Sequence, residues 1–341
     1  MAELRQIVLA KRPDGVPTVG HFRLDQAPMP EPEVGEVLVR TLWFSLDPYQ
    51  RGLMDAGKSY TAPVPVGGKI RGGGVGEVIA SRHAGFAEGD IVLAGTGWAS
   101  HALDHGDALL KLDPGLAPVQ TALGVLGMPG HTGWVGLTDI AEARADETIV
   151  VSAATGAVGS LVGQLAKHRG LRVIGVAGGA DKCAYAVETL GFDACIDHRA
   201  AEDWRGLSKE ISTAAPDGVD IYFENVGGQT LNAVVPLMNQ GGRIPICGMI
   251  SWYSGQDVDK AMPLPRAWLT ILTQRLRVQG FIITDHQDRF RPFQEEVAPL
   301  VASGQIAYRE TVTDGLEQAP AAFLSMLDGG NFGKQLVRVA E

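Results

Sequence analysis

Residues 152–160 place two glycines among small side chains at the junction between an apolar stretch and a helical pattern. They match the order G-x-G-x-x-G, except that Ala154 fills the first glycine position. Gly156 would let the backbone approach a pyrophosphate, Gly159 would let the helix pack on the strand, and the helix N-terminus would attract negative charge. The pattern predicts a dinucleotide site, with an ordinary glycine-rich turn as the alternative. The expected pyrophosphate site comprises Gly156, Ala157, Val158 and Gly159.

The next apolar stretch, 172–177, ends in Gly178-Gly179-Ala180 and carries no carboxylate at its tip. A site for NAD places Asp or Glu about 20 residues after the turn, where it accepts hydrogen bonds from the ribose 2′-hydroxyl. Here Lys182 follows instead, and a cation would attract the 2′-phosphate of NADP. The sequence therefore favours NADPH/NADP as cofactor; the alternative is a solvated lysine in the first turn of a helix.

Apolar stretches that alternate with helical patterns must position these residues. Strands are expected near 148–152, 172–177, 194–197, 219–223, 243–247 and 278–284, and the helices after the first near 181–190, 202–214, 229–239, 266–275 and 287–303. Buried strands alternating with helices predict an α/β domain with a doubly wound, six-stranded parallel sheet, the Rossmann fold.

Two glycine-containing segments follow strands of this expected sheet. Asn225-Val226-Gly227-Gly228 comes after the fourth strand, and Cys247-Gly248-Met249-Ile250 ends the fifth. Ligands bind such sheets at the carboxyl ends of the strands. Both segments could therefore line a cofactor cleft, or be routine turns.

The flanking parts of the chain have a different pattern of apolar and polar residues. Residues 1–125 show short alternating segments separated by Gly and Pro clusters, which is typical of a small antiparallel barrel or sandwich. Two strand-like runs around a helical pattern follow Gly304 and resemble this first part. We therefore expect a nucleotide-binding domain at 126–304, inserted into a β-rich substrate domain made of 1–125 and 305–341.

Composition narrows the class of partner. The 29 basic and 39 acidic residues give a net charge of −10, and no run of Lys or Arg exceeds two residues. This argues against nucleic-acid and membrane partners and favours a small-molecule partner. Three cysteines without C-x-x-C spacing favour a reduced, cytoplasmic setting. The charged N-terminus and the absence of a long apolar run predict a soluble, unprocessed protein.

Several catalytic devices are absent from the sequence: Tyr-x-x-x-Lys, G-x-S-x-G, the P-loop and H-E-x-x-H. His101 and His105 could form a metal pair on a helix, but Gly106 would break that helix and no cysteine lies nearby. We therefore interpret them as surface loop histidines and expect no bound metal.

Six ordered segments together resemble the zinc-free branch of the medium-chain dehydrogenases/reductases, which contains prostaglandin reductases, leukotriene 12-hydroxydehydrogenase and alkenal or curcumin double-bond reductases. The resemblance extends over most of the chain. The segments are Asp47-Pro48-Tyr49-Gln50-Arg51, Gly127-Met128-Pro129-Gly130-His131-Thr132-Gly133, residues 153–160, Glu224-Asn225-Val226-Gly227-Gly228, Cys247-Gly248-Met249-Ile250-Ser251 and Asn331-Phe332-Gly333-Lys334.

The resemblance implies a GroES-like substrate domain, a homodimer formed by extending the cofactor sheet, and roles for individual residues. It assigns the 2′-phosphate to Lys182. His198 stands where the family usually has tyrosine; with Arg199 it could still bind a phosphate, in a pH-dependent way. The residues implied around the nicotinamide half are Met128, Asn225, Cys247, Gly248, Ile250, Ser251, Tyr253, Phe281, Ile282, Ile283, Asn331 and Gly333.

The implied reaction is the NADPH-dependent reduction of the C=C bond of an α,β-unsaturated ketone or aldehyde. Hydride reaches the β-carbon, and the negative charge left on the carbonyl oxygen must be stabilised. The resemblance assigns this to the Tyr253 hydroxyl, with the cofactor's ribose hydroxyl, and places Tyr49 in the pocket wall. An exposed loop tyrosine and a core tyrosine are the respective alternatives. Rival functions are a zinc-free quinone reductase and an NADPH-binding structural or sensor protein with little turnover.

Overall fold

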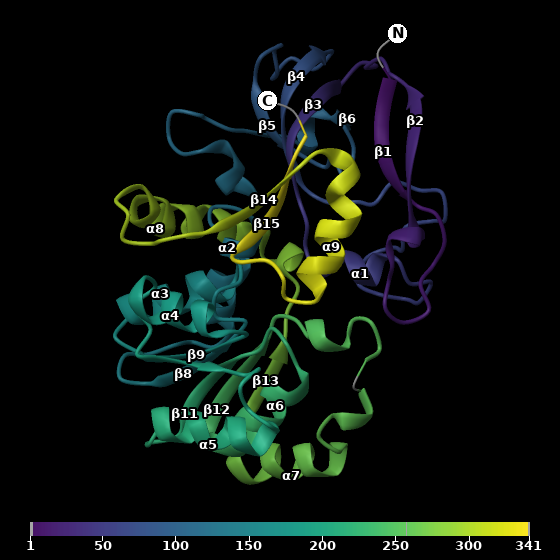
Figure 1. Ribbon diagram of the computed structural model, residues 1–341. Coiled ribbons are helices and arrows are strands. Elements are labelled where there is room, and N and C mark those ends of the chain that lie inside the picture. Colours follow the sequence, from purple (N-terminus) through teal and green to yellow (C-terminus); the bar gives the residue numbers. More distant parts are fainter. Residues whose placement is uncertain (1–2, 257, 340–341) are drawn as a thin grey trace. The chain divides into compact units, whose positions relative to one another are not determined.

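The computed structural model describes residues 3–256 and 258–339, so Met1 and Ala2 of the charged N-terminus lie outside the described residues. The chain divides into two compact units (Figure 1). One comprises Met1–Gly124 and Glu310–Glu341, and the other comprises Val125–Arg309. The inserted unit thus extends past the expected residue 304, because Ile306, Ala307 and Tyr308 pack on its hydrophobic core.

The inserted unit is built on a parallel sheet whose six strands are hydrogen-bonded in the order β10-β9-β8-β11-β12-β13. This confirms the predicted doubly wound α/β fold. The strands are β8 (Thr148–Ser152), β9 (Arg172–Ala177), β10 (Ala194–Asp197), β11 (Val219–Phe223), β12 (Met238–Ile246) and β13 (Arg277–Gly280).

Helices cover both faces of this sheet, as Figure 1 shows. Successive residues of β8 point to opposite faces: Ile149 and Val151 belong to one core and Val150 to the other. The first core is completed by α2 (Met128–Val135), α3 (Gly159–His168), α4 (Ala180–Glu188) and α8 (Phe290–Ala302). The second is completed by α5 (Trp204–Ala214), α6 (Gly228–Val234) and α7 (Leu264–Gln274). Among the described residues, none of the helices combines the length and hydrophobicity needed to cross a membrane.

Two expected element boundaries were wrong. The helix expected at 229–239 ends at Val234, a short 3-10 turn, η5 (Val235–Leu237), follows, and β12 already begins at Met238. Pro236 explains this end, because proline has no N–H to donate and the α-helical series of hydrogen bonds stops there. The strand expected at 278–284 ends at Gly280, and η8 (Ile283–Arg289) follows it.

The other unit contains a seven-stranded sheet and a separate antiparallel pair. The sheet comprises β3 (Glu36–Ser45), β4 (Gly74–Ser81), β5 (Ile91–Ala94), β6 (His101–His105), β7 (Leu110–Lys111), β14 (Glu310–Asp314) and β15 (Lys334–Arg338), and the pair is β1 (Glu3–Leu9) with β2 (Phe22–Pro28). Since β15 pairs with β3, the C-terminal residues return to the N-terminal sheet. His101 and His105 lie in strand β6, not in the loop that we expected, and pair with β3.

A buried ion pair joins two of the segments that carry the family resemblance. Lys334 Nζ lies 2.7 Å from Asp47 Oδ1 and donates to Leu46 O, also at 2.7 Å. Ser45 Oγ donates to the same aspartate, and both charged side chains are buried. This pair fixes the start of α1 (Gln50–Leu53), and with it Tyr49, relative to β15. Removing one partner of such a pair leaves an uncompensated buried charge.

Candidate functional site

The turn between β8 and α3 closes tightly on itself. Ala153 has a φ of 48°, in the left-handed region that favours glycine, and its carbonyl oxygen accepts a hydrogen bond from Gly156 N at 2.8 Å. A Cβ at Gly159 would lie 2.4 Å from the same oxygen. Only glycine fits there, so the first turn of α3 is held directly against the end of β8.

The glycine missing from the first position is compensated on the neighbouring strand. Ala154 is fully buried, and its amide donates to Val176 O of β9 at 3.1 Å. A Cβ at Gly175 would lie 2.8 Å from the Ala154 Cβ. The methyl group of Ala154 therefore occupies space that Gly175 leaves open, and the alanine does not disturb the turn.

Basic side chains gather at the tip of β9. A Cβ at Gly178 would lie 2.8 Å from Arg199 Nε and 2.9 Å from His198 Nε2, so both side chains approach the backbone there. Burial and the charge of Arg199 lower the pKa of Lys182 at the start of α4. Burial and Arg199 likewise lower the pKa of His198. Neighbouring basic groups at one strand tip form a site suited to an anion, and His198 would contribute more charge as the pH falls.

The carboxylate of Asp197, at the end of the neighbouring β10, is turned toward the backbone. Asp197 Oδ1 accepts hydrogen bonds from Gly179 N at 2.8 Å and from Arg199 N at 2.9 Å. Burial acts to raise the pKa of Asp197, but these two N–H groups hold it below its ordinary value. Asp197 therefore shapes the tip of β9 and β10.

A buried carboxyl group organises the end of β11. Glu224 Oε1 accepts from Val226 N at 2.6 Å and from Gly227 N at 2.9 Å. Ser152 Oγ, at the end of β8, lies 3.3 Å from the same oxygen and accepts from Asn225 N at 2.8 Å. Burial raises the pKa of Glu224, while the two amide donors act to lower it.

The backbone of the same residue reaches the end of β12. Glu224 O accepts from Cys247 N at 2.9 Å and from Gly248 N at 3.1 Å. Burial and the nearby Glu224 raise the pKa of the Cys247 thiol to about 12, so this thiol is neutral near pH 7. The side-chain amide of Asn225 donates to Ser152 O at 2.8 Å. The carboxyl ends of β8, β11 and β12 are thus joined by hydrogen bonds, and together they form the carboxyl edge of the sheet.

Tyr253 folds back over this edge. Its hydroxyl oxygen accepts from Met249 N at 3.3 Å and would lie 3.0 Å from a Cβ at Gly248. Ser251 Oγ donates to Val226 O at 2.6 Å, and Ile250 N donates to Asn225 O at 3.3 Å. The residues after β12 therefore lie against the loop after β11, with the Tyr253 hydroxyl at the carboxyl end of the strand.

Four further predicted residues of the inserted unit lie elsewhere on it. Met128 begins α2 and is 39% exposed. We expected Phe281 and Ile283 to end a strand, but β13 stops before them. Both side chains instead pack on the core beneath α2 and α8. Ile282 lies between them and immediately precedes η8.

Three predicted residues belong to the other unit. Tyr49 precedes α1, and burial together with Asp47 raises the pKa of its hydroxyl, so Tyr49 is a neutral hydrogen-bonding group. Asn331 Nδ2 donates to Gly333 O at 2.7 Å, just before β15.

Sequence reasoning gave Glu224 no role of its own. It appeared only as the first residue of a recognised segment. The sequence does contain an indication of this role. An acidic residue directly after a buried strand can accept hydrogen bonds from the backbone N–H groups of the residues that follow it.

Within residues 3–256 and 258–339, no three His, Cys, Asp or Glu side chains gather in a group that could hold a metal ion.

The fold and the carboxyl edge of its parallel sheet together define a nucleotide-binding oxidoreductase of the medium-chain dehydrogenase/reductase type. Residues 5–112 match the family described as the N-terminal domain of oxidoreductase, and residues 157–301 match that described as zinc-binding dehydrogenase. The chain belongs to the branch of this superfamily that contains curcumin reductase, prostaglandin reductase 1 and 2-alkenal reductase.

The similarity to these relatives extends from end to end. An NADPH-dependent curcumin reductase of Escherichia coli is 46% identical over 98% of this chain and 97% of its own length. Prostaglandin reductase 1 of Mus musculus is 40% identical over 99% of this chain and all of its own. The crystal structure of CurA in complex with NADPH from Vibrio vulnificus, 46% identical, superimposes with a TM-score of 0.94 over 99% of both chains.

Replacing Glu224 tests its role at the edge. Glu224→Ala leaves the partly buried Val226 N and the buried Gly227 N without their acceptor, which we expect to lower the free energy of unfolding by about 2–4 kcal/mol. Glu224→Gln keeps an acceptor oxygen and should lose less than half as much. Urea unfolding measures both, with Glu210→Ala on the exposed face of α5 as the matched control. Equal stability of the two alanine variants would contradict the role.

Proposed function

We propose that this protein is an NADPH-dependent reductase of C=C bonds conjugated to a ketone or an aldehyde. The observation that carries the proposal is the arrangement at the carboxyl ends of β8, β11 and β12. These strand ends bring the glycine-containing turn after β8 and the Tyr253 hydroxyl to the same side of one sheet. Relatives named for NADPH-dependent curcumin reduction and prostaglandin reduction match the chain over nearly its whole length, which supports the substrate class.

The residues present fit this cofactor. The close approach of α3 to β8 is possible only with glycine at 159, and a pyrophosphate would lie against the N-terminus of this helix. The cluster of Lys182, His198 and Arg199 would hold the 2′-phosphate, because a phosphate would offset the burial and the Arg199 charge that lower the pKa of Lys182 and of His198. Asn225 and the residues 247–251 would lie along the nicotinamide half. When bound, NADPH supplies the hydride that the β-carbon of the substrate accepts.

Tyr253 would stabilise the negative charge that develops on the substrate during the reaction. Hydride addition at the β-carbon moves negative charge to the carbonyl oxygen of the substrate, and a fixed hydrogen-bond donor stabilises that charge most when it is greatest. The Met249 amide holds the Tyr253 hydroxyl over Gly248 through the acceptor side of its oxygen. In the reaction the hydroxyl group would donate its proton in a hydrogen bond to the carbonyl oxygen, and the α-carbon would take its proton from water or through Tyr253. Tyr49 would line the substrate pocket.

The substrate class is tested by NADPH oxidation with medium-chain 2-alkenals, 15-keto prostaglandins, curcumin-like dienones and quinones. We expect the carbonyl-conjugated alkenes to be reduced with the highest kcat/KM. Faster reduction of the quinones would support a zinc-free quinone reductase instead. No turnover with any of them would leave a binding protein and overturn the proposal.

In the same assay, Tyr253→Phe should lower kcat/KM for the best alkene about tenfold or more, a loss of about 1.4 kcal/mol in transition-state stabilisation. Tyr308→Phe removes a hydroxyl elsewhere in the same unit and should have little effect. An unimpaired Tyr253→Phe variant would remove the tyrosine from the chemistry.

Lys182→Ala should raise the KM for NADPH about tenfold while changing kcat and the KM for NADH little, because a charge-assisted bond to the 2′-phosphate is lost. Steady-state kinetics with both cofactors measures this, and Lys209→Ala on exposed α5 is the control. An unchanged preference for NADPH would show that Lys182 does not contact the phosphate.

We further propose a cytoplasmic homodimer. The three cysteines are free thiols, which suits a reducing compartment. Strand β13 stands at an end of the parallel sheet, and the nearby α7 exposes Trp268, Leu269 and Leu272. An open strand edge beside exposed apolar side chains suits pairing with a second copy.

Sedimentation equilibrium should find a dimer for the native protein and a monomer for the double variant Leu269→Glu with Leu272→Glu, because buried charges at the interface would be unpaired. Lys209→Glu with Thr213→Glu, at exposed positions of α5, is the matched control. A native monomer, or a double variant that remains dimeric, would contradict this interface.

A further inference from the structure

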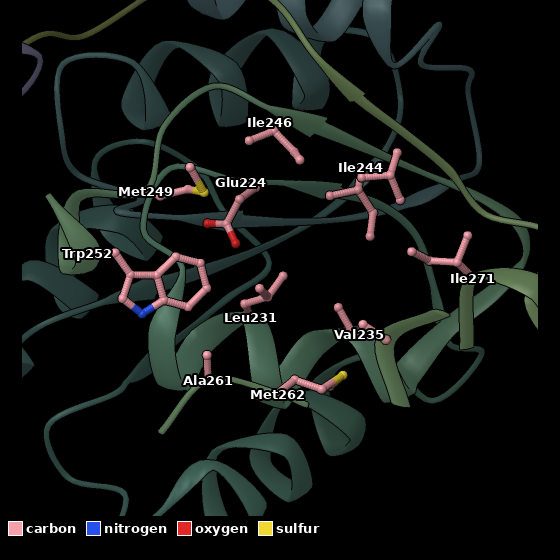
Figure 2. A pocket seen from close by; sticks show the side chains of 12 residues that line it. Glu224, Leu231, Val235, Ile244, Ile246, Met249, Trp252, Ala261, Met262 and Ile271 are labelled. Carbon is pink, nitrogen blue, oxygen red and sulfur yellow. The ribbon is translucent and has the colours of Figure 1, made fainter. Parts of the chain in front are cut away.

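A partly open cavity of about 160 Å³ lies within the inserted unit, and Glu224, whose Oε2 has no hydrogen-bond partner, is one of its lining residues. Apolar side chains from α6, η5, β12, β13, α7 and the segment 249–262 form its walls. Among the described residues that line it, Glu224 supplies the one ionisable group. Figure 2 shows the Glu224 carboxyl group between Met249, Trp252 and Leu231.

The two oxygens of this carboxyl group differ. Oε1 accepts from the amides of Val226 and Gly227, whereas Oε2 is buried and has no hydrogen-bond partner. The Tyr222 hydroxyl lies near enough to act on the pKa of Glu224, yet neither it nor Oε2 makes a bond of normal geometry. A buried polar atom without a partner costs free energy unless something else bonds to it.

The size and chemistry of the cavity restrict what could bond there. An apolar cavity of roughly 150 Å³ in another protein stays dry and takes up benzene. A hydroxyl group both donates and accepts, so it can bond to Oε2 whether the carboxyl group is ionised or neutral. An ammonium group would lose its water among apolar walls, and burial, which raises the pKa of Glu224, disfavours the charged partner that it needs.

We propose that this cavity binds a small alcohol or phenol, whose apolar body fills it and whose hydroxyl group hydrogen-bonds to Glu224 Oε2. The cavity borders the proposed active site through Met249, but the proposed reaction uses Glu224 only through Oε1 and its backbone. Its occupant would nevertheless touch the residue that holds the loop after β11.

Isothermal titration of phenol into the intact protein, without cofactor, tests this directly. We expect one saturable site with a Kd on the order of 1 mM. Toluene has the same ring and methyl-sized substituent without the hydroxyl group. Its Kd should be at least about fivefold higher than that of phenol. Ala267→Leu places extra carbon atoms in the cavity and should weaken phenol binding about tenfold. Ala302→Leu, at an exposed position of α8, is the matched control and should bind phenol as the native protein does.

Ala261→Leu fills the same cavity from the segment 249–262 and serves if Ala267→Leu does not fold. Absence of saturable phenol binding would overturn the proposal. Equal binding of phenol and toluene would also overturn it, because Glu224 would then contribute nothing. Undiminished binding by the filled variants would place the ligand elsewhere. None of these outcomes depends on whether the protein reduces alkenes.

Discussion

The buried carboxyl group of Glu224 is the interaction on which the candidate site depends. Its side chain holds the amides after β11, its carbonyl oxygen holds those after β12, and it lies against Ser152 at the end of β8. The carboxyl oxygen accepts two N–H bonds and the backbone carbonyl of the same residue accepts two more. Three loops that are distant in sequence therefore have their relative positions set by one residue, and Tyr253 is positioned through the last of them.

The features that could be predicted from sequence are those with local causes. The buried strands, the alternation with helices and the glycine at 159 each follow from a few neighbouring residues, so the doubly wound fold was predictable. The errors have local causes too: Pro236 ends α6 early, and Phe281 looked like a strand residue because an apolar run does not show which core it enters. Contacts between distant residues were not predictable. Ala154 is compatible with the turn only because Gly175 lies opposite it on another strand.

Charge at the tip of β9 shows how an acid can be present without serving the role that its position suggests. Asp197 ends the adjacent strand, where a carboxylate could in principle meet a ribose hydroxyl. Its oxygen is instead used by the amides of Gly179 and Arg199, which draw the turn together. The basic groups of Lys182, His198 and Arg199 are left to define the electrostatics of the tip. This division of roles favours a phosphate over a hydroxyl at that position.

The choice of glutamate at 224 links the edge to the cavity behind it. The loop after β11 needs one acceptor oxygen, which glutamine would supply without burying an ionisable group. Glutamine would, however, present an NH₂ group to apolar walls, and that group can only donate. A carboxyl group can donate or accept at Oε2 according to its protonation, and burial, by raising its pKa, makes the donating form more accessible. The second oxygen is therefore adaptable toward a bound hydroxyl group, and the loop alone gives no reason for that adaptability.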